Sequence, residues 1–288
     1  MCSSDLRLAE ANGLVQVTGD GFAVAFNKAA GLLVSLTKDG RELVKEPLRP
    51  HFWRAPTDND RGYGMEKKFG AWRHVGREWT PASVTVTQLD AGDVKVVASG
   101  PLPGVGGSYT LTYDVLAGGD VRIEAAYAPE ASTKSPNLTR FGLQMTAPAG
   151  FEALTWYGRG PQETYSDRCD ARVDVFSGQV SEQAFAYTEP GEMGNKVDVR
   201  WVTLCDKKGF GLLAIGQPLL SVNALPYATD DLEGPKHAYQ IPRRDFVTLN
   251  LDLRQMGVGG DDSWGAQPHP EYRIPPTAQH YRLRLRPL

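Results

Sequence analysis

Two adjacent carboxylates near the end of the chain are the first residues whose types could do chemistry. Asp261 and Asp262 lie in the segment MGVGGDDSWG (256–265). A retaining glycosidase needs two carboxyl groups about 5–5.5 Å apart, on opposite sides of a sugar. Neighbouring side chains of an extended chain point to opposite faces, and in a turn they bind nearby backbone amides. We therefore predict that both aspartates shape the loop rather than form a catalytic pair.

Trp264 follows these aspartates in the same glycine-rich segment. No apolar alternation around it predicts a position in the core. An indole can stack on the apolar face of a pyranose while its N–H binds a hydroxyl group. It can also fill the edge of a β-sandwich. The residue pattern alone favours neither role.

A second group of polar residues lies in FWRAPTDNDRG, near the first quarter of the chain. Arg54 has a planar guanidinium that can form two parallel hydrogen bonds with one carboxylate. Asp58 and Asp60 are close enough in sequence to be that partner. We predict that such a pair holds the 51–64 loop in shape.

The same segment resembles the start of a calcium loop, because Asp58, Asn59 and Asp60 precede a glycine, Gly62. An EF-hand loop needs a glutamate at its twelfth position, where this chain has Phe69. We therefore predict a turn in which the Asp and Asn side chains accept hydrogen bonds from backbone amides.

Other catalytic chemistry lacks its usual sequence pattern. No two histidines have a metal-ligand spacing such as HxxxH, so we predict no metal site in this chain. The sequence has no GxSxG motif and no GxxxxGK[ST] motif. The five histidines are His51, His74, His237, His269 and His280.

Strands must position these loops, because alternation of apolar and polar residues dominates the chain. Four such runs follow one another between residues 84 and 128, separated by Gly, Asp and Pro, which predicts an antiparallel meander. A helical pattern is weak, with at most one turn within 233–239. We predict an all-β fold of fifteen or more strands, in two packed antiparallel sheets. Residues 6–288 would form one domain, after a non-native or disordered start over residues 1–5. The other predicted strands are 22–27, 32–37, 140–148, 198–204, 211–216, 246–253 and 280–288.

Composition limits the possible partners and the compartment. The net charge is −3 with no basic cluster, so we expect neither nucleic acid nor an anionic membrane as partner. No apolar run approaches 18 residues, and the first residues do not resemble a secretory signal. Three widely spaced cysteines predict free thiols and a reducing cytoplasm.

Taken together, four loops resemble the C-terminal domain, or small subunit, of the large β-galactosidases of glycoside hydrolase family 2. The resemblance covers nearly the whole chain, and these four long motifs occur in the family's order and spacing. It implies a β-supersandwich, the galactose mutarotase-like fold. The motifs are FWRAPTDNDRG (52–62), WYGRGPQETYSDR (156–168), YTEPGEMGN (187–195) and MGVGGDDSWG (256–265).

The resemblance also implies a division of labour. In the family, a TIM-barrel region outside this chain holds both catalytic glutamates and the Mg²⁺ and Na⁺ ligands, and the complete enzyme is an oligomer that hydrolyses terminal β-galactosides such as lactose. The DDSW motif supplies a substrate-binding tryptophan, which corresponds to Trp264. The loop containing Gly62 resembles a mobile loop beside the active site. We expect the isolated chain to be inactive and to bind no cofactor.

Two other functions remain open at this stage. The chain could be a free-standing carbohydrate-binding protein, or an aldose mutarotase. A mutarotase needs a general acid and a general base in one cleft, usually His with Glu. The nearest match is His269 with Glu271, in what we predict to be an edge loop.

Overall fold

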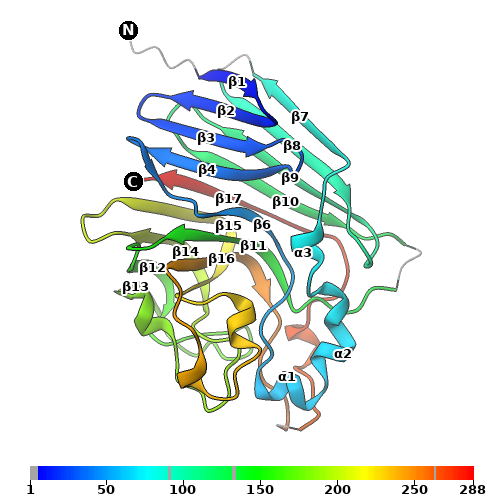
Figure 1. The fold of residues 1–288 in the computed structure, drawn as a ribbon. Coiled ribbons are helices and arrows are strands. Elements are labelled where there is room, and N and C mark those ends of the chain that lie inside the picture. The colour runs from blue at the N-terminus through cyan, green and yellow to red at the C-terminus, as the bar shows by residue number, and fades with distance from the viewer. Residues whose placement is uncertain (1–5, 90–91, 132–133, 263) are drawn as a thin grey trace.

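A computed structural model describes residues 6–89, 92–131, 134–262 and 264–288 of the chain. The predicted non-native start, residues 1–5, lies outside the described residues, as does Ser263. In the described part, 17 strands form one hydrogen-bonded sheet that folds over itself into two layers (Figure 1). The fold is therefore an all-β antiparallel sandwich, as predicted, although its two layers are continuous.

The N-terminal strands form one end of a layer. They pair antiparallel in chain order from β1 to β5, and β6 returns to pair with β4. Alternate side chains of these strands face the core. In β3, for example, Val24 and Phe26 are fully buried while their neighbours are not. These strands are β1 (Arg7–Ala11), β2 (Leu14–Gly19), β3 (Phe22–Asn27), β4 (Leu32–Lys38), β5 (Arg41–Glu42) and β6 (Glu46–His51).

The predicted meander is confirmed in the opposite layer. Each of its strands pairs antiparallel with the next, from β7 to β10. The last strand, β10, then pairs with the C-terminal strand β17. The bounds are β7 (Ser83–Gln88), β8 (Val94–Pro101), β9 (Ser108–Val115), β10 (Val121–Ala128) and β17 (Gln279–Pro287).

A long bent strand joins the two layers. The first half of β15, residues 212–217, pairs with β17, and its second half, 221–225, pairs with β16. From β16 the sheet continues through β11 to β6. The strands are β11 (Arg140–Pro148), β12 (Ala153–Gly160), β13 (Arg172–Gln179), β14 (Lys196–Cys205), β15 (Gly211–Leu225) and β16 (Phe246–Gln255).

Aromatic rings fill the space between the layers. Phe26 of β3 contacts Tyr113 of β9 with a centroid distance of 4.9 Å, and Phe141 of β11 contacts Tyr281 of β17 at 5.9 Å. Among the other tryptophans, Trp53, Trp72, Trp79 and Trp156 are buried, as expected of packing residues, whereas Trp201 is only partly buried. The core thus needs no contribution from Trp264.

Sequence analysis missed two features of the fold. A run of short helices, α1 (Asp58–Gly62), α2 (Met65–Phe69), η1 (Gly70–Trp72) and α3 (Val75–Glu78), follows β6. The turn predicted at residues 58–62 is instead helix α1, although the Asp60 side chain accepts a hydrogen bond from the Thr57 backbone amide, as predicted. Helices this short do not show a helical period in the sequence. The segment 156–160, read as loop, belongs to β12.

Further single 3₁₀ turns lie between the later strands. The predicted turn within 233–239 corresponds only in part to η4 (Ala238–Gln240). The others are η2 (Val180–Gln183), η3 (Thr229–Leu232) and η5 (Pro270–Tyr272). No helix in the described part of the chain is long and apolar enough to cross a membrane.

Candidate functional site

The four loop motifs meet at one end of the sandwich, beside α1 at the lower edge of Figure 1. The Arg61 guanidinium of the first motif donates to the Pro190 carbonyl of the third motif at 2.8 Å. Glu163 of the second motif accepts from the Tyr187 hydroxyl and, at 2.7 Å, from the Gly194 amide of the third. The fold thus gathers segments that are up to 203 residues apart in sequence.

Arg54 connects the first motif to the fourth. Its Nη2 lies 2.8 Å from Oδ1 of Asp60, and its Nε lies 3.0 Å from Oδ2, so the ion pair is bidentate. The same guanidinium donates to the carbonyls of Met256 and Gly257, the latter at 2.8 Å. Burial alone lowers the pKa of Arg54, but the Asp60 carboxylate outweighs that effect and raises it. Arg54 therefore stays charged and holds the backbone of Met256 and Gly257, which form the base of the loop that carries Trp264.

Asp60 is shared between this pair and the start of α1. It forms a capping box with Thr57, in which each backbone amide donates to the other residue's side chain. It also accepts from the Tyr63 hydroxyl at 2.7 Å. Asp58, the other partner considered for Arg54, is exposed and lies 3.6 Å from Arg61. The carboxylate that pairs with Arg54 is thus the buried one.

Asn59 and Gly62 are the other residues predicted to shape this loop. The Asn59 side chain donates to the Val258 carbonyl at 3.0 Å, which adds a second contact between α1 and the fourth motif. Gly62 is the exposed last residue of α1, and Gly64 follows with a φ of 74°, which favours glycine. The mobility that the resemblance implies for this loop stays a prediction.

The Trp264 loop is organised from within by Asp262. Its Oδ1 accepts hydrogen bonds from the backbone amides of Trp264, Gly265 and Ala266, at 3.0, 2.8 and 2.9 Å. The amides of Ala266 and Trp264 are the main cause of a lowered pKa for Asp262. Gly260 closes the loop, because a Cβ there would lie 2.6 Å from the Ala266 carbonyl oxygen.

Asp261 faces the other way and pairs with a histidine. Its Oδ1 lies 2.9 Å from Nε2 of His269, and this hydrogen bond is the largest of the effects that raise the pKa of His269. His269 Nδ1 is 3.9 Å from Glu271, and all three side chains are more than half exposed. The adjacent aspartates thus bind different partners within their own loop, which fits the loop-shaping role predicted for them.

Trp264 itself points away from the protein. Its exposed fraction is 79%, against 4% or less for the tryptophans of the core. Within the described structure, its indole makes no ring contact with another aromatic side chain. A large, flat apolar side chain is therefore presented to solvent beside backbone amides that bind Asp262.

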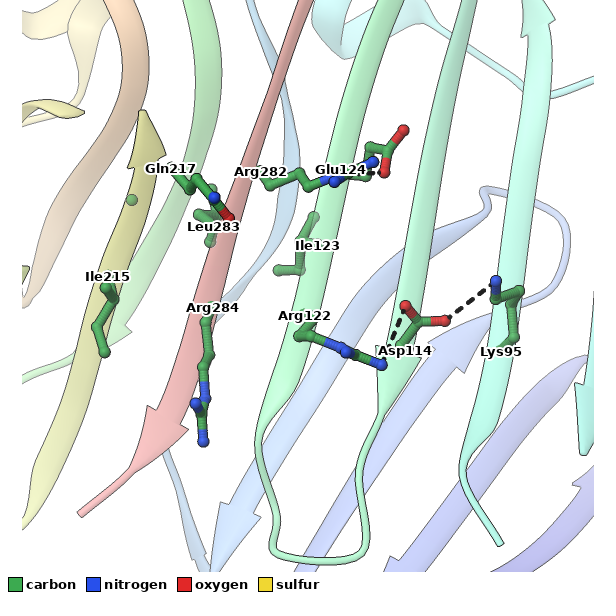
Figure 2. Close-up of a pocket in the computed structure, with 11 residues that line it drawn as sticks. Lys95, Asp114, Arg122, Ile123, Glu124, Ile215, Gln217, Arg282, Leu283 and Arg284 are labelled. Atoms are coloured by element: carbon green, nitrogen blue, oxygen red, sulfur yellow. Dashed lines mark hydrogen bonds and ion pairs between the residues drawn. The ribbon is translucent and has the colours of Figure 1, made fainter. Parts of the chain in front are cut away.

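A cleft of about 260 Å³ lies beside this loop. Its wall combines Asn59 of α1, Tyr165 and Arg168 of the second motif, Tyr187 of the third and Val258 of the fourth. These aromatic and hydrogen-bonding groups are suited to a polar ligand or to the surface of another domain. A separate open hollow on the outer sheet face (Figure 2) is lined by charged side chains, of which Asp114 pairs with Lys95 and Arg122.

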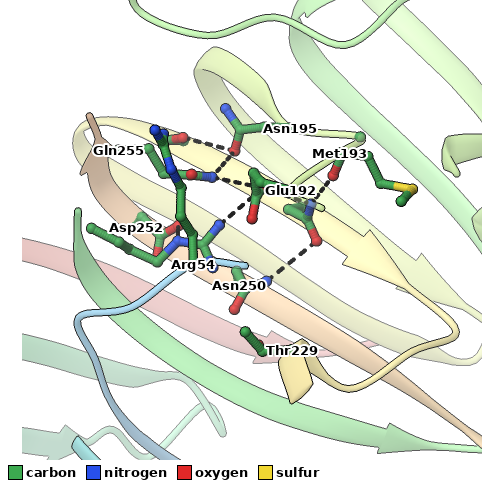
Figure 3. Close-up of polar contacts among 12 residues, drawn as sticks. Arg54, Glu192, Met193, Asn195, Thr229, Asn250, Asp252 and Gln255 are labelled. Atoms are coloured by element: carbon green, nitrogen blue, oxygen red, sulfur yellow. Dashed lines mark hydrogen bonds and ion pairs between the residues drawn. The ribbon is translucent and has the colours of Figure 1, made fainter. Parts of the chain in front are cut away.

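Sequence reasoning missed a buried polar cluster behind the cleft (Figure 3). Arg140 lies between two carboxylates, with Nη2 3.2 Å from Glu192 and Nε 3.0 Å from Asp252. Gln255 donates to Glu192 and to Asn195 at 3.1 and 3.0 Å. Burial, opposed by Arg140, raises the pKa of Asp252 to about 8. All five side chains are buried, and Glu192 also lines the cleft, so the cluster forms part of the wall behind it.

One sequence signal could have revealed the cluster. Polar residues alternate with apolar ones along β11 and β16, so each strand carries a polar face opposite the face that packs in the core. Gly142 of β11 lies opposite Asp252, where a Cβ would be 1.8 Å from Oδ1. A glycine inside a strand often marks such a close approach. Among the described residues, no group of three or more His, Cys, Asp or Glu side chains could hold a metal ion.

Solved structures of similar shape define the class to which this fold belongs. A putative aldose 1-epimerase from Escherichia coli superposes with a TM-score of 0.51 over 98% of this chain and 99% of its own, at 8% identity. A GalM/aldose epimerase homologue from C. elegans superposes with a TM-score of 0.51 over 96% and 99%, at 10% identity. At such identities the likeness shows the fold alone. The protein is thus a galactose mutarotase-like β-sandwich.

Sequence comparison narrows the assignment. The chain belongs to the β-galactosidase small chain family, whose sequence model matches residues 18–286. A β-galactosidase from Priestia megaterium is 40% identical over 260 residues, and one from Halalkalibacterium halodurans is 34% identical over 276. These matches cover 90% and 93% of this chain but 25% and 27% of the relatives. The chain therefore spans about a quarter of their length.

Proposed function

We propose that the chain is a non-catalytic part of a β-galactosidase and completes the sugar pocket of a retaining hydrolase. The observation that carries the proposal is the exposed Trp264 indole on an internally fixed loop, at the end where the four family motifs meet. Its partner would be the catalytic TIM-barrel region, as a separate large subunit or as an earlier part of the same polypeptide. Membership of the family and the quarter-length match to β-galactosidases support this arrangement.

The chain would contribute binding and orientation, while proton transfer and nucleophilic attack come from the partner region. Asp261 and Asp262 bind His269 and backbone amides of their own loop, which supports a loop-shaping role for both. The exposed indole would stack on one face of the galactosyl ring or its leaving group. The Mg²⁺ and Na⁺ of the complete enzyme would be bound outside this chain.

Two further parts of the proposal concern assembly and location. The complete enzyme would be an oligomer, as the family resemblance implies. Cys169 and Cys205 are free thiols among the described residues, which agrees with a reducing cytoplasm. Self-association and compartment can be measured separately from activity, by light scattering and by cell fractionation.

Reconstitution tests the proposal. The chain alone, the catalytic region alone and their mixture or fusion are assayed on a chromogenic β-galactoside and on lactose. We expect turnover only when both parts are present. Hydrolysis by the isolated chain that disappears when one of its own carboxylates is substituted would refute a non-catalytic role.

A free-standing sugar-binding protein is the alternative that the exposed Trp264 also supports. Calorimetric titration of the isolated chain with galactose and lactose distinguishes the two functions. Strong binding without any partner favours the alternative, whereas binding only after assembly favours the enzyme component. A mutarotase lacks comparable support, because His269, which precedes η5, and Glu271 within it are exposed and line neither the cleft nor the hollow described above.

A further inference from the structure

Asp167 of the second motif binds the backbone at the base of the Trp264 loop. Its Oδ1 accepts from the Val258 amide at 3.1 Å, and its Oδ2 accepts from the Gly259 amide at 2.7 Å. Hydrogen bonds from backbone amides to a carboxylate are charge-assisted and stronger than neutral ones. Both amides belong to residues that immediately follow the Arg54 contacts at Met256 and Gly257.

The glycines of this segment are explained by the carboxylate. A Cβ at Gly257 would lie 2.4 Å from Oδ2 of Asp167, and one at Gly259 would lie 3.2 Å from the same atom. Neither glycine has a positive φ, so conformational freedom does not require them. The space that they leave is occupied by the Asp167 side chain.

The backbone of residues 256–259 is bound both through its carbonyl oxygens and through its amides. Arg54 and Asn59 donate to the carbonyls of residues 256–258, whereas Asp167 accepts from the amides of residues 258 and 259. The segment is therefore held by both its donors and its acceptors. Beyond it, Asp262 fixes the short loop that carries Trp264. Because the chain is continuous, the position of residues 256–259 sets where that loop begins.

We propose that Asp167 is a positioning residue, which sets the place of the Trp264 indole by holding the backbone of Val258 and Gly259. The inference rests on the proposed sugar-binding role of Trp264, and assigns to the second motif a task in the same reaction. Asp167 does not touch substrate in this arrangement. It acts only through the loop.

A double-mutant cycle in the complete enzyme tests the proposal. Asp167→Asn keeps the shape of the side chain but turns one acceptor into a donor facing an amide. We expect kcat/KM on lactose to fall by at most about fivefold, because displacing the indole can cost no more than the loss of its contact with the sugar. Asp170→Asn, at an exposed aspartate two residues beyond the second motif, is the matched control and should leave kcat/KM unchanged.

The second arm repeats Asp167→Asn in a Trp264→Ala background. If Asp167 acts through the indole, the second substitution should lower kcat/KM by less than twofold there. If Asp167→Asn lowers kcat/KM by the same factor in the Trp264→Ala background as in the wild type, the inference is overturned. It is also overturned if a smaller folded fraction fully explains the loss from Asp167→Asn. If Trp264→Ala alone has no effect, the proposed function fails instead, so the two failures are distinct.

A milder variant keeps the test available if Asp167→Asn does not fold. Gly259→Ala adds a methyl group close to Oδ2 of Asp167 and should shift the carboxylate by a few tenths of an ångström. We expect a smaller loss of kcat/KM that again disappears in the Trp264→Ala background. An equal loss in both backgrounds would overturn the proposal.

Discussion

Replacing Trp264 by alanine should leave the fold almost unchanged. The side chain is 79% exposed, so only about a fifth of its surface is buried. A large aromatic buries about 150–250 Å² when fully covered, so the loss is roughly 40 Å², or about 1 kcal/mol at 25 cal/mol per Å². The hydrogen bond from the backbone amide of residue 264 to Asp262 survives the substitution.

The expected change in thermal midpoint is correspondingly small. At about 2.1 cal/mol/K per residue, unfolding of this chain has an entropy of roughly 0.6 kcal/mol/K, so about 1 kcal/mol shifts Tm by about 2 °C. Trp72→Ala is the matched control, because Trp72 is fully buried. Its cavity should cost about 3–5 kcal/mol, or roughly 5–8 °C.

Kinetics of the complete enzyme supply the functional half of the test. An aromatic contact with a sugar face is worth about 1 kcal/mol, so kcat/KM should fall about fivefold in Trp264→Ala. If the indole binds ground state and transition state alike, KM rises and kcat holds. A fall in both kcat and kcat/KM would show that it also orients the reacting sugar. Unchanged kinetics with a stability loss like that of Trp72→Ala would refute the reasoning.

Three further predictions concern the groups behind the loop. Arg54→Met leaves the Asp60 carboxylate buried without its partner and should cost about 3–5 kcal/mol, measured by urea unfolding; a loss below 1 kcal/mol would contradict this. Asp262→Ala should release the amides of residues 264–266 and lower kcat/KM with little change in Tm, because the loop is exposed; equal kinetics would show that the loop keeps its shape unaided. Asp252 has a pKa raised to about 8, so the folded state retains a proton that the unfolded state loses near pH 4. Stability should therefore fall as pH rises from about 4 to about 8, and the slope should be shallower in Asp252→Asn; identical slopes in unfolding experiments would refute the assignment.

Local sequence pattern predicted much of the sheet. Strands such as β9 and β10 alternate apolar and polar residues because one face packs in the core and the other meets solvent. Glycine and aspartate between them indicated the turns. The helices after β6 were missed because each is a single turn or little more, too short to show a period of 3.6 residues.

The sequence also pointed to the loops of the candidate site. No regular apolar alternation surrounds Trp264, and the residue is exposed, although the pattern alone left a packing role open. Adjacent aspartates in a glycine-rich stretch predicted a loop held by its own amides, which Asp262 now shows. Arg54 was predicted to pair with one of two aspartates, but which one depended on burial.

Only the tertiary structure decided which distant residues meet. Asp167 and Val258 are 91 positions apart, and Arg54 and Met256 are 202 apart, so no local pattern relates them. The buried cluster likewise brings together Arg140 of β11, Asp252 of β16 and Glu192 of the loop before β14. Local periodicity reports which way a side chain faces, because backbone geometry repeats over a few residues. Contacts between loops depend on how the sheet folds over itself, and that is settled by packing across the whole chain.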